Sequence, residues 1–168
     1  MAPSFTSSFP DALVIRRATA EDVRALGVLG ASLLRTHYEF DAQRFMAPPP
    51  DPESGYAWFL GTQLKEDDVA VFVAEVSGTV VGYVYAALEP QSWKELREAA
   101  GFIHDVVIAP EARRHGVAAA LIEAACAWLR STGAPRVVLS TAERNDAAQR
   151  LFARLGFRRT MIEMTKEL

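Results

Sequence analysis

The sequence predicts an α/β fold in which helices cover both faces of one mixed β-sheet. Runs of β-branched and aromatic residues alternate along the chain with segments in which apolar residues recur at helical spacing. Turn-forming stretches separate these segments, as at "SG" (77–78) and "PPPDP" (48–52). The predicted element order is β-α-α-β-β-β-α-β-α-β.

The first half of the chain is predicted to contain a strand, two helices and a hairpin. Thr19, with Asp22 three residues later, is typical of a helix start, and Gly27 and Gly30 weaken the helix that follows. Prolines make the loop between the two helices irregular. The dipeptide at 77–78 joins two β-rich runs and indicates a β-hairpin. The predicted elements are a strand at 13–19, helices at 20–38 and 54–66 with a loop at 41–53 between them, and strands at 69–76 and 79–88.

The second half predicts three more strands and two helices. The first of these strands, "GFIHDVVIA", is apolar on both faces, which is typical of a central strand. Asn145 can cap the last helix and Gly156 can end it. The predicted elements are a strand at 101–109, a helix at 116–130, a strand at 135–141, a helix from 145 to 156 and a strand at 158–167.

Composition limits the possible functions. At 168 residues with half of them apolar, the chain is long enough for one domain with a real core. Its net charge of -3 argues against a general nucleic-acid binder, although residues 1–100 carry -6 and residues 101–168 carry +3. The single cysteine, Cys126, and three scattered histidines predict neither a disulfide nor a metal site. Without a signal-like or membrane-spanning segment, we expect a cytoplasmic protein.

A basic loop joins the predicted central strand to the helix after it. In "PEARRHGVAAALIEAA" (110–125), Arg113, Arg114 and His115 precede Gly116, and small apolar residues follow. The first amides of a helix have no partners within the helix and carry partial positive charge, so they attract anions. The loop therefore predicts a phosphate site, and the alternative is a helix start with solvated arginines. Neither the P-loop pattern nor the dinucleotide fingerprint is present.

Two motifs resemble those of the GNAT superfamily of acetyl-CoA-dependent N-acetyltransferases. "IHDVVIAPEARRHGVAAALIEAA" is similar to the family's central signature, a strand and a Pro-Glu turn followed by R/Q-x-x-G-x-G/A at the start of a long helix. Arg113, Gly116 and Ala118 stand at the three defining positions. "NDAAQRLFARLGF" (145–157) resembles the second signature, an asparagine-initiated helix that ends near Gly-Phe. The resemblance implies one GNAT domain over 13–168 after a flexible tail at 1–12, with a mostly antiparallel sheet of six to seven strands splayed between its two central strands.

The resemblance also implies where acetyl-CoA, the cosubstrate, binds. The amides of 113–118 hold its pyrophosphate, the pantetheine arm lies along the strand at Val106 and Ile108, and an amide near Val106 or Val107 stabilises the reacting carbonyl oxygen. Asn145 would bind the pantetheine, and capping its own helix is an equally good reason for this residue. The implied coenzyme-binding residues are Val106, Val107, Ile108, Arg113, Arg114, His115, Gly116, Val117, Ala118, Asn145 and Phe152.

The strand before the loop carries the candidate catalytic base. His104 aligns with the base of some relatives, and histidine is a residue type suited to proton transfer near neutral pH. Strand alternation places Phe102, His104, Val106 and Ile108 on one face and Ile103, Asp105 and Val107 on the other. Asp105 is the competing base if a family-typical β-bulge turns it toward the acceptor. The alternative is that both polar groups only satisfy each other or nearby backbone.

The acid that reprotonates the thiolate departs from the family pattern. Many relatives carry a tyrosine where this chain has Phe152, so water or another side chain must serve, with Tyr83 and Tyr85 as candidates. Catalysis by Cys126 is not expected, because its place within a helix suits a buried apolar residue.

The expected acceptor is an amine-bearing small molecule, bound by the first two helices, the 41–53 loop and the 89–98 turn. A small amine, an aminoglycoside, an amino acid and a protein N-terminus remain open. We expect no nucleic-acid or membrane partner, and a homodimer. The alternative function is a non-catalytic acyl-CoA-binding sensor. The acceptor region offers Glu39, Asp41, Asp51, Glu53, Glu89 and Glu95 as carboxylates, and Tyr38, Phe40, Phe45, Trp58 and Trp93 as apolar walls.

Overall fold

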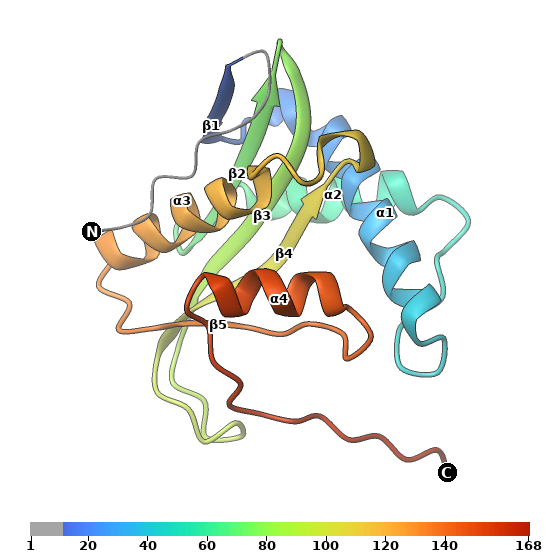
Figure 1. Cartoon of the computed structure of the whole chain (residues 1–168), viewed down its shortest axis with the longest axis vertical. Helices are drawn as coiled ribbons and strands as arrows, with labels where there is room; N and C mark the ends of the chain where they lie inside the picture. Colours follow the sequence, from blue (N-terminus) through green and yellow to red (C-terminus); the bar gives the residue numbers. More distant parts are fainter. Residues whose placement is uncertain (1–11) are drawn as a thin grey trace.

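The computed structural model describes residues 12–168, so the predicted tail, except for residue 12, lies outside the described residues. Five strands and four α-helices occur in this range (Figure 1). The elements are β1 (Leu13–Arg17), η1 (Ala20–Asp22, a 3-10 turn), α1 (Val23–Phe40), α2 (Pro52–Gln63), β2 (Val69–Val76), β3 (Thr79–Glu89), β4 (Ala100–Ile108), η2 (Pro110–Ala112, a 3-10 turn), α3 (Val117–Ser131), β5 (Val137–Leu139) and α4 (Asp146–Arg154).

The sheet has the order β1-β2-β3-β4-β5, antiparallel except for the parallel β4–β5 pair. One hydrophobic core forms where α1 and α2 cover the face that carries Tyr83 and Val107. A second core forms where α3 covers the opposite face, around Val84 and Ile103. Figure 1 shows α3 in front of the strands and α2 behind them. The prediction of a mixed sheet with helices on both faces is confirmed.

The predicted hairpin is confirmed, and Ser77 and Gly78 form the turn between its two strands. β2 and β3 pair from Val76–Thr79 to Val69–Ala87. Ser77 and Gly78 both have positive φ angles, 49° and 76°, as a tight turn that follows the strand twist requires.

The predicted count of six to seven strands is wrong, because the described residues form five strands. Residues 158–167, predicted as the last strand, are extended and exposed, and no strand within 12–168 pairs with them. Met161, Ile162 and Met164 are mostly exposed. A strand requires backbone hydrogen bonds to a neighbour, and a β-rich sequence does not supply that neighbour.

The second helix begins earlier than predicted because proline opens it. The Asp51 side chain accepts a hydrogen bond from the Ser54 amide (3.1 Å), and Pro52 occupies the first turn. Proline fits there because its missing N–H would have no partner inside the helix. Pro52 therefore ends the irregular loop, whereas Pro48, Pro49 and Pro50 lie within it.

Gly27 and Gly30 allow α1 and α2 to pack closely. A Cβ on Gly27 would lie 2.5 Å from the Glu53 carbonyl oxygen, and one on Gly30 would lie 2.0 Å from the Tyr56 ring. The predicted weakening of the helix by these glycines stays a prediction, but their lack of a side chain lets α2 and its Tyr56 pack against α1.

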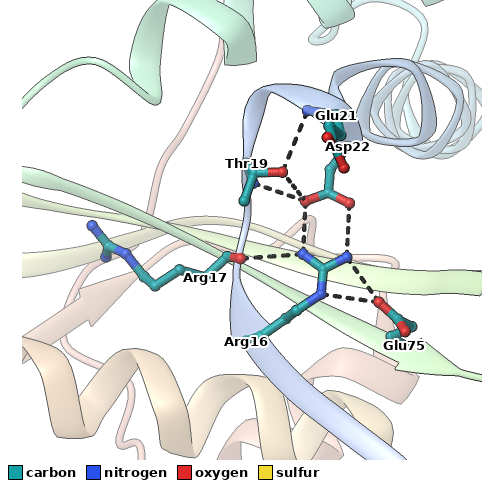
Figure 2. A network of polar contacts seen from close by, with 6 residues as sticks. All are labelled: Arg16, Arg17, Thr19, Glu21, Asp22 and Glu75. Carbon is teal, nitrogen blue, oxygen red and sulfur yellow. Dashed lines mark hydrogen bonds and ion pairs between the residues drawn. The ribbon is translucent and has the colours of Figure 1, made fainter. Parts of the chain in front are cut away.

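An ion-pair network fixes the start of this helical layer to the sheet (Figure 2). Arg16 of β1 donates two hydrogen bonds to Asp22, at 2.8 and 2.9 Å, and one to Glu75 of β2, at 2.9 Å. The Thr19 side chain and Asp22 also form the predicted capping box. The bonds from Arg16 lower the pKa of the buried Asp22 carboxyl, so this residue stays charged and holds the chain that leads into α1.

Candidate active site

A β-bulge in β4 decides which way the candidate catalytic residues face. Tyr85 of β3 pairs with Asp105, but the next residue, Ala86, pairs with Ile103, so His104 is the extra residue. Ile103 therefore packs in the α3 core, whereas Asp105 contacts hydroxyl groups on the α1–α2 face. The predicted alternation, which placed Ile103 and Asp105 on one face, is wrong because the bulge breaks it. The bulge that would re-aim Asp105 is present.

Two tyrosines from different elements hold the Asp105 carboxylate. Tyr83 of β3 donates a hydrogen bond to its Oδ2 at 2.8 Å, and Tyr56 of α2 donates one to the same oxygen at 3.2 Å. Desolvation by the surrounding protein raises the pKa of Asp105, and the two hydroxyl donors oppose that rise in part. Burial also raises the pKa of Tyr83, so its phenol stays protonated as a donor. A carboxyl with a raised pKa is better suited to accept a proton near neutral pH.

His104 has different partners. Its Nε2 lies 3.0 Å from the Glu89 carboxylate, and its ring contacts the rings of Tyr85 and Phe102 at centroid distances of 4.9 and 5.8 Å. The alternative interpretation supposed that the His104 and Asp105 side chains form hydrogen bonds with each other. The structure shows no hydrogen bond between these two side chains. Each has its own structural partners, and both remain candidates.

A pocket of about 300 Å³ opens over the middle of β4. It receives side chains from α1, the following loop, α2, β4, β5 and α4, and both candidate bases line it. Its lining residues are Leu33, Leu34, His37, Phe45, Met46, Tyr56, Ile103, His104, Asp105, Val106, Leu139, Ser140, Thr141, Asn145, Ala148 and Phe152.

The backbone of β4 is open on the side of this pocket. The parallel pairing of β4 with β5 ends at Ile103–Leu139, although β4 continues to Ile108. The Ala109 amide bonds to Val81 of β3, so by strand alternation Val107 also faces β3, and Val106 and Ile108 face the separated edge. The predicted splay between the two strands is therefore present. The Val106 and Val107 amides are the two candidates to stabilise the reacting carbonyl oxygen of the thioester. Only the Val106 amide faces the gap.

The basic loop forms the predicted exposed helix start. Arg114 and Gly116 have positive φ angles of 66° and 81°, and a Cβ on Gly116 would meet no atom within 4 Å. No side chain of the described residues caps α3, whose first intrahelical bond runs from the Ala120 amide to Gly116. Arg113 Nε donates to the Ile108 carbonyl at 3.1 Å, which ties the loop to the end of β4. Loop residues 113–118 are not among those that line the pocket.

Val117 and Ala118 show how the loop meets the core. Val117 is buried in the α3 core, whereas Ala118 and His115 are partly exposed. The loop thus keeps its backbone at the surface while one apolar side chain anchors it.

Asn145 and Phe152 both line the pocket from α4. Asn145 caps the helix as predicted, because its Oδ1 accepts a hydrogen bond from the Ala148 amide at 3.2 Å. The Phe152 ring packs edge-on against Phe157 at a centroid distance of 5.9 Å. Capping and packing therefore account for both residues, and their positions also allow contact with a molecule in the pocket.

Tyr83 and Tyr85, the candidate acids, do not line the pocket. The Tyr83 hydroxyl binds Asp105, and the Tyr85 hydroxyl donates to Gln63 Oε1 at 2.8 Å. Burial in the α3 core raises the pKa of the Cys126 thiol, which agrees with an inert cysteine.

Sequence reasoning missed Tyr56 and His37. Tyr56 reaches the site from α2, and the His37 ring lies in the pocket with its Nδ1 2.9 Å from the Leu33 carbonyl. The signal for Tyr56 was available, because small residues at positions 27, 30 and 31 are typical of a helix face that a second helix approaches closely.

Most of the predicted acceptor carboxylates have local structural partners. Asp51 caps α2, Glu53 binds Arg35 at 2.6 Å, Glu95 binds Arg97 at 2.9 Å, and Asp41 accepts two loop amides. Of the residues predicted as apolar walls, Phe45 lines the pocket. The side chains of Trp58 and Trp93 do not line it and are 72% and 83% exposed.

Comparison with known proteins identifies the family that this chain matches. The family model of the acetyltransferase (GNAT) family matches residues 32–157. A mycothiol acetyltransferase of Thermobispora bispora is 36% identical over 98 residues, which cover 58% of this chain and 33% of that protein. An N-alpha-acetyltransferase of Sulfurisphaera tokodaii is 30% identical over 117 residues, which cover 66% of this chain and 70% of that protein. The chain thus spans about a third of the length of the mycothiol enzyme.

The solved structures extend the likeness to the whole fold. An aminoglycoside N-acetyltransferase in complex with CoA superposes with a TM-score of 0.74 at 18% identity, over 96% of this chain and 97% of that chain. Within residues 12–168, no helix has the length and apolar character needed to cross a membrane.

Proposed function

The chain belongs to the GNAT family of acetyltransferases, and we propose that it transfers the acetyl group of acetyl-CoA to an amine-bearing small molecule. One observation carries this proposal: a half-buried carboxylate, Asp105, lines the same pocket as the open edge of β4. A proton acceptor and unpaired backbone donors then face one space, as amine acylation requires. We also propose that residues 13–168 form a single GNAT domain.

The coenzyme side is built from backbone. Exposed amides at the start of α3 suit the pyrophosphate, and the positive φ and open space at Gly116 leave room for close approach. Arg113 and Arg114 add positive charge there. The open edge at Val106 and Ile108 suits the amide groups of the pantetheine arm, and an arm bound there would bring the thioester to the pocket that Asp105 lines.

Each proposed residue has a distinct task in the reaction. Acetyl-CoA supplies the acetyl group as a thioester. Asp105 accepts a proton from the amine, whose nitrogen forms the new C–N bond as the C–S bond breaks. The Val106 amide donates to the carbonyl oxygen as that oxygen gains charge. His104, held beside Glu89, is the second candidate for proton transfer.

The thiolate receives its proton from pocket water. Phe152 cannot donate a proton, and the Tyr83 and Tyr85 hydroxyls are committed to Asp105 and Gln63. The proton given up by the amine balances the one gained by sulfur, so the net reaction turns amine and thioester into amide and thiol. The same Phe152 supports the alternative function, a sensor that binds an acyl-CoA without turnover.

Two measurements test the proposal. Calorimetry with acetyl-CoA reports binding, and thiol release in the presence of an amine panel reports turnover. We expect Gly116→Glu to weaken acetyl-CoA binding at least about a hundredfold, because it places a negative side chain where the phosphates bind. Binding without thiol release on any amine would favour the sensor.

Gly133→Glu is the matched control. Gly133 also has a positive φ, 87°, and no neighbour within 4 Å of a Cβ, but it lies at the other end of α3. It introduces the same strain and charge away from the proposed phosphate site. Equal losses of binding in the two variants would contradict the placement of the coenzyme.

A further inference from the structure

The acceptor half of the pocket has walls that are apolar except for His37. The side chains that α1 and its following loop contribute are Leu33, Leu34, His37, Phe45 and Met46. Tyr56 of α2 adds a ring whose hydroxyl is directed at Asp105. An acceptor that enters from this side therefore contacts aliphatic and aromatic groups before it reaches the carboxylate.

Asp105 is the one carboxylate among the residues that line this pocket, all of which lie in the described range. The carboxylates of neighbouring segments do not line the pocket and have partners of their own: Glu53 binds Arg35, Asp51 caps α2, and Glu89 binds the lining residue His104. The pocket thus offers one negative group, at its inner wall.

The charged residue closest in sequence to the loop walls is basic. Arg44 stacks over the Phe45 ring at 5.0 Å from its centroid and forms an ion pair with Glu163. Arg44 is not part of the lining, so a second ammonium inside the pocket would meet the walls formed by Leu34, Phe45 and Met46 instead of a carboxylate. Moving a charge out of water without a partner is costly.

The volume also limits the acceptor. At about 300 Å³, the pocket is at the small end of the range of about 300–1,000 Å³ for small-molecule sites, and the acetyl group occupies part of it. An alkyl or phenylalkyl chain is small enough for this volume, whereas most of a multi-ring polycation would extend beyond the walls.

We propose that the acceptor is a small primary monoamine with an apolar aliphatic or aromatic body, selected against polyamines and aminoglycosides by the walls at Leu34, Phe45 and Met46. This inference rests on the proposed acetyl transfer and names its substrate class. The ammonium or amine group lies at Asp105, and the apolar body lies between α1 and the 41–46 loop.

The test compares butylamine with 1,4-diaminobutane, which differ by one ammonium on the same chain. Phenethylamine and kanamycin extend the series to an aromatic monoamine and a bulky polycation. We expect kcat/KM for butylamine and phenethylamine to exceed the values for the diamine and kanamycin at least about tenfold, which corresponds to about 1.4 kcal/mol. Calorimetry on the same amines measures selectivity independently of turnover.

Wall variants should change this preference. Met46 is 68% exposed at the pocket, so Met46→Glu adds a carboxylate without disturbing the core. We expect it to shift the ratio toward the diamine at least about tenfold. Leu34→Asp should act in the same direction. Val28→Glu is the control, because Val28 lies on α1, is 54% exposed and is not part of the lining.

The outcomes separate this inference from the proposed function. Turnover with preference for the diamine or kanamycin would overturn the monoamine class and leave acetyl transfer intact. Selective binding of butylamine without turnover would support the pocket's selectivity and contradict the proposed function. An equal change of the amine preference in Met46→Glu and Val28→Glu would show that the assigned walls do not select the acceptor.

Discussion

The two sides of the pocket are built in different ways. The side of β4, β5 and the two following helices presents backbone groups, and its features come from short stretches such as 113–118 and the cap at Asn145. The side of α1 and α2 presents side chains. These reach the space beside Asp105 because the two helices pack against the sheet. Tyr56 and Asp105 are 49 residues apart in the chain. In the proposed function, coenzyme recognition is thus local, whereas acceptor recognition depends on the tertiary structure.

Asp105→Asn is expected to have the largest effect. Asp105 lies on β4, on the coenzyme side of the pocket, and it binds Tyr56 of α2, on the acceptor side. We expect kcat/KM with the best amine to fall about 10²–10⁴-fold, as for the loss of a general base. Asn keeps the size of the side chain and can still accept hydrogen bonds from Tyr56 and Tyr83. Asp67→Asn, on an exposed turn, is the matched control.

Asp105→Asn is also expected to change how the stability of the fold depends on pH. Because the pKa of Asp105 is raised in the folded state, the wild-type protein loses stability as the pH rises from the ordinary Asp range through that raised value. Asp105→Asn removes this loss, so its Tm at neutral pH should equal or exceed that of the wild type. Activity within a few-fold of wild type would exclude Asp105 as the base, and a fall in Tm would show that its charge stabilises the fold.

Gly30→Ala tests whether the acceptor side depends on helix packing. A Cβ there would lie 2.0 Å from the Tyr56 ring, so Tyr56 must move. Overpacking of this kind costs about 1–3 kcal/mol in the free energy of unfolding, and kcat should fall as the Tyr56 hydroxyl leaves Asp105. Chemical denaturation and steady-state kinetics measure the two effects.

Gly55→Ala is its control on the facing helix. A Cβ on Gly55 meets no atom within 4 Å, and alanine is the better helix former by about 1 kcal/mol. This variant should be more stable with unchanged activity. Similar behaviour of the two alanine variants would show that the α1–α2 contact does not position Tyr56.

The smallest expected effect is a shift in pH dependence. The hydrogen bond from Tyr56 lowers the pKa of Asp105, so Tyr56→Phe should raise that pKa. The acidic limb of kcat/KM should therefore move to higher pH, with a loss of only a few-fold at its plateau. Tyr85→Phe, which removes a hydroxyl bound to Gln63, should leave the limb in place. An unmoved limb in Tyr56→Phe would mean that the limb belongs to another group.

Much of the fold could be predicted from particular residues. The β2–β3 turn follows from Ser77 and Gly78, and the end of α4 follows from Gly156, because each requires a backbone conformation that acts within a few positions. The strand predicted at 158–167 is absent from the structure, and the sequence could not show this because the local pattern says nothing about a pairing partner. The face of Asp105 depended on one extra residue, His104, in the β3–β4 ladder.

The sequence alone determined the order of most helices and strands, the basic start of α3 and the cap at Asn145, because propensity, capping and turn geometry act between residues close along the chain. The tertiary structure decided that Asp105 meets Tyr56 and Tyr83, that β4 and β5 part after Ile103, and that α1 supplies apolar walls. These features depend on which surfaces pack and pair across long separations, and no short segment specifies its distant partner.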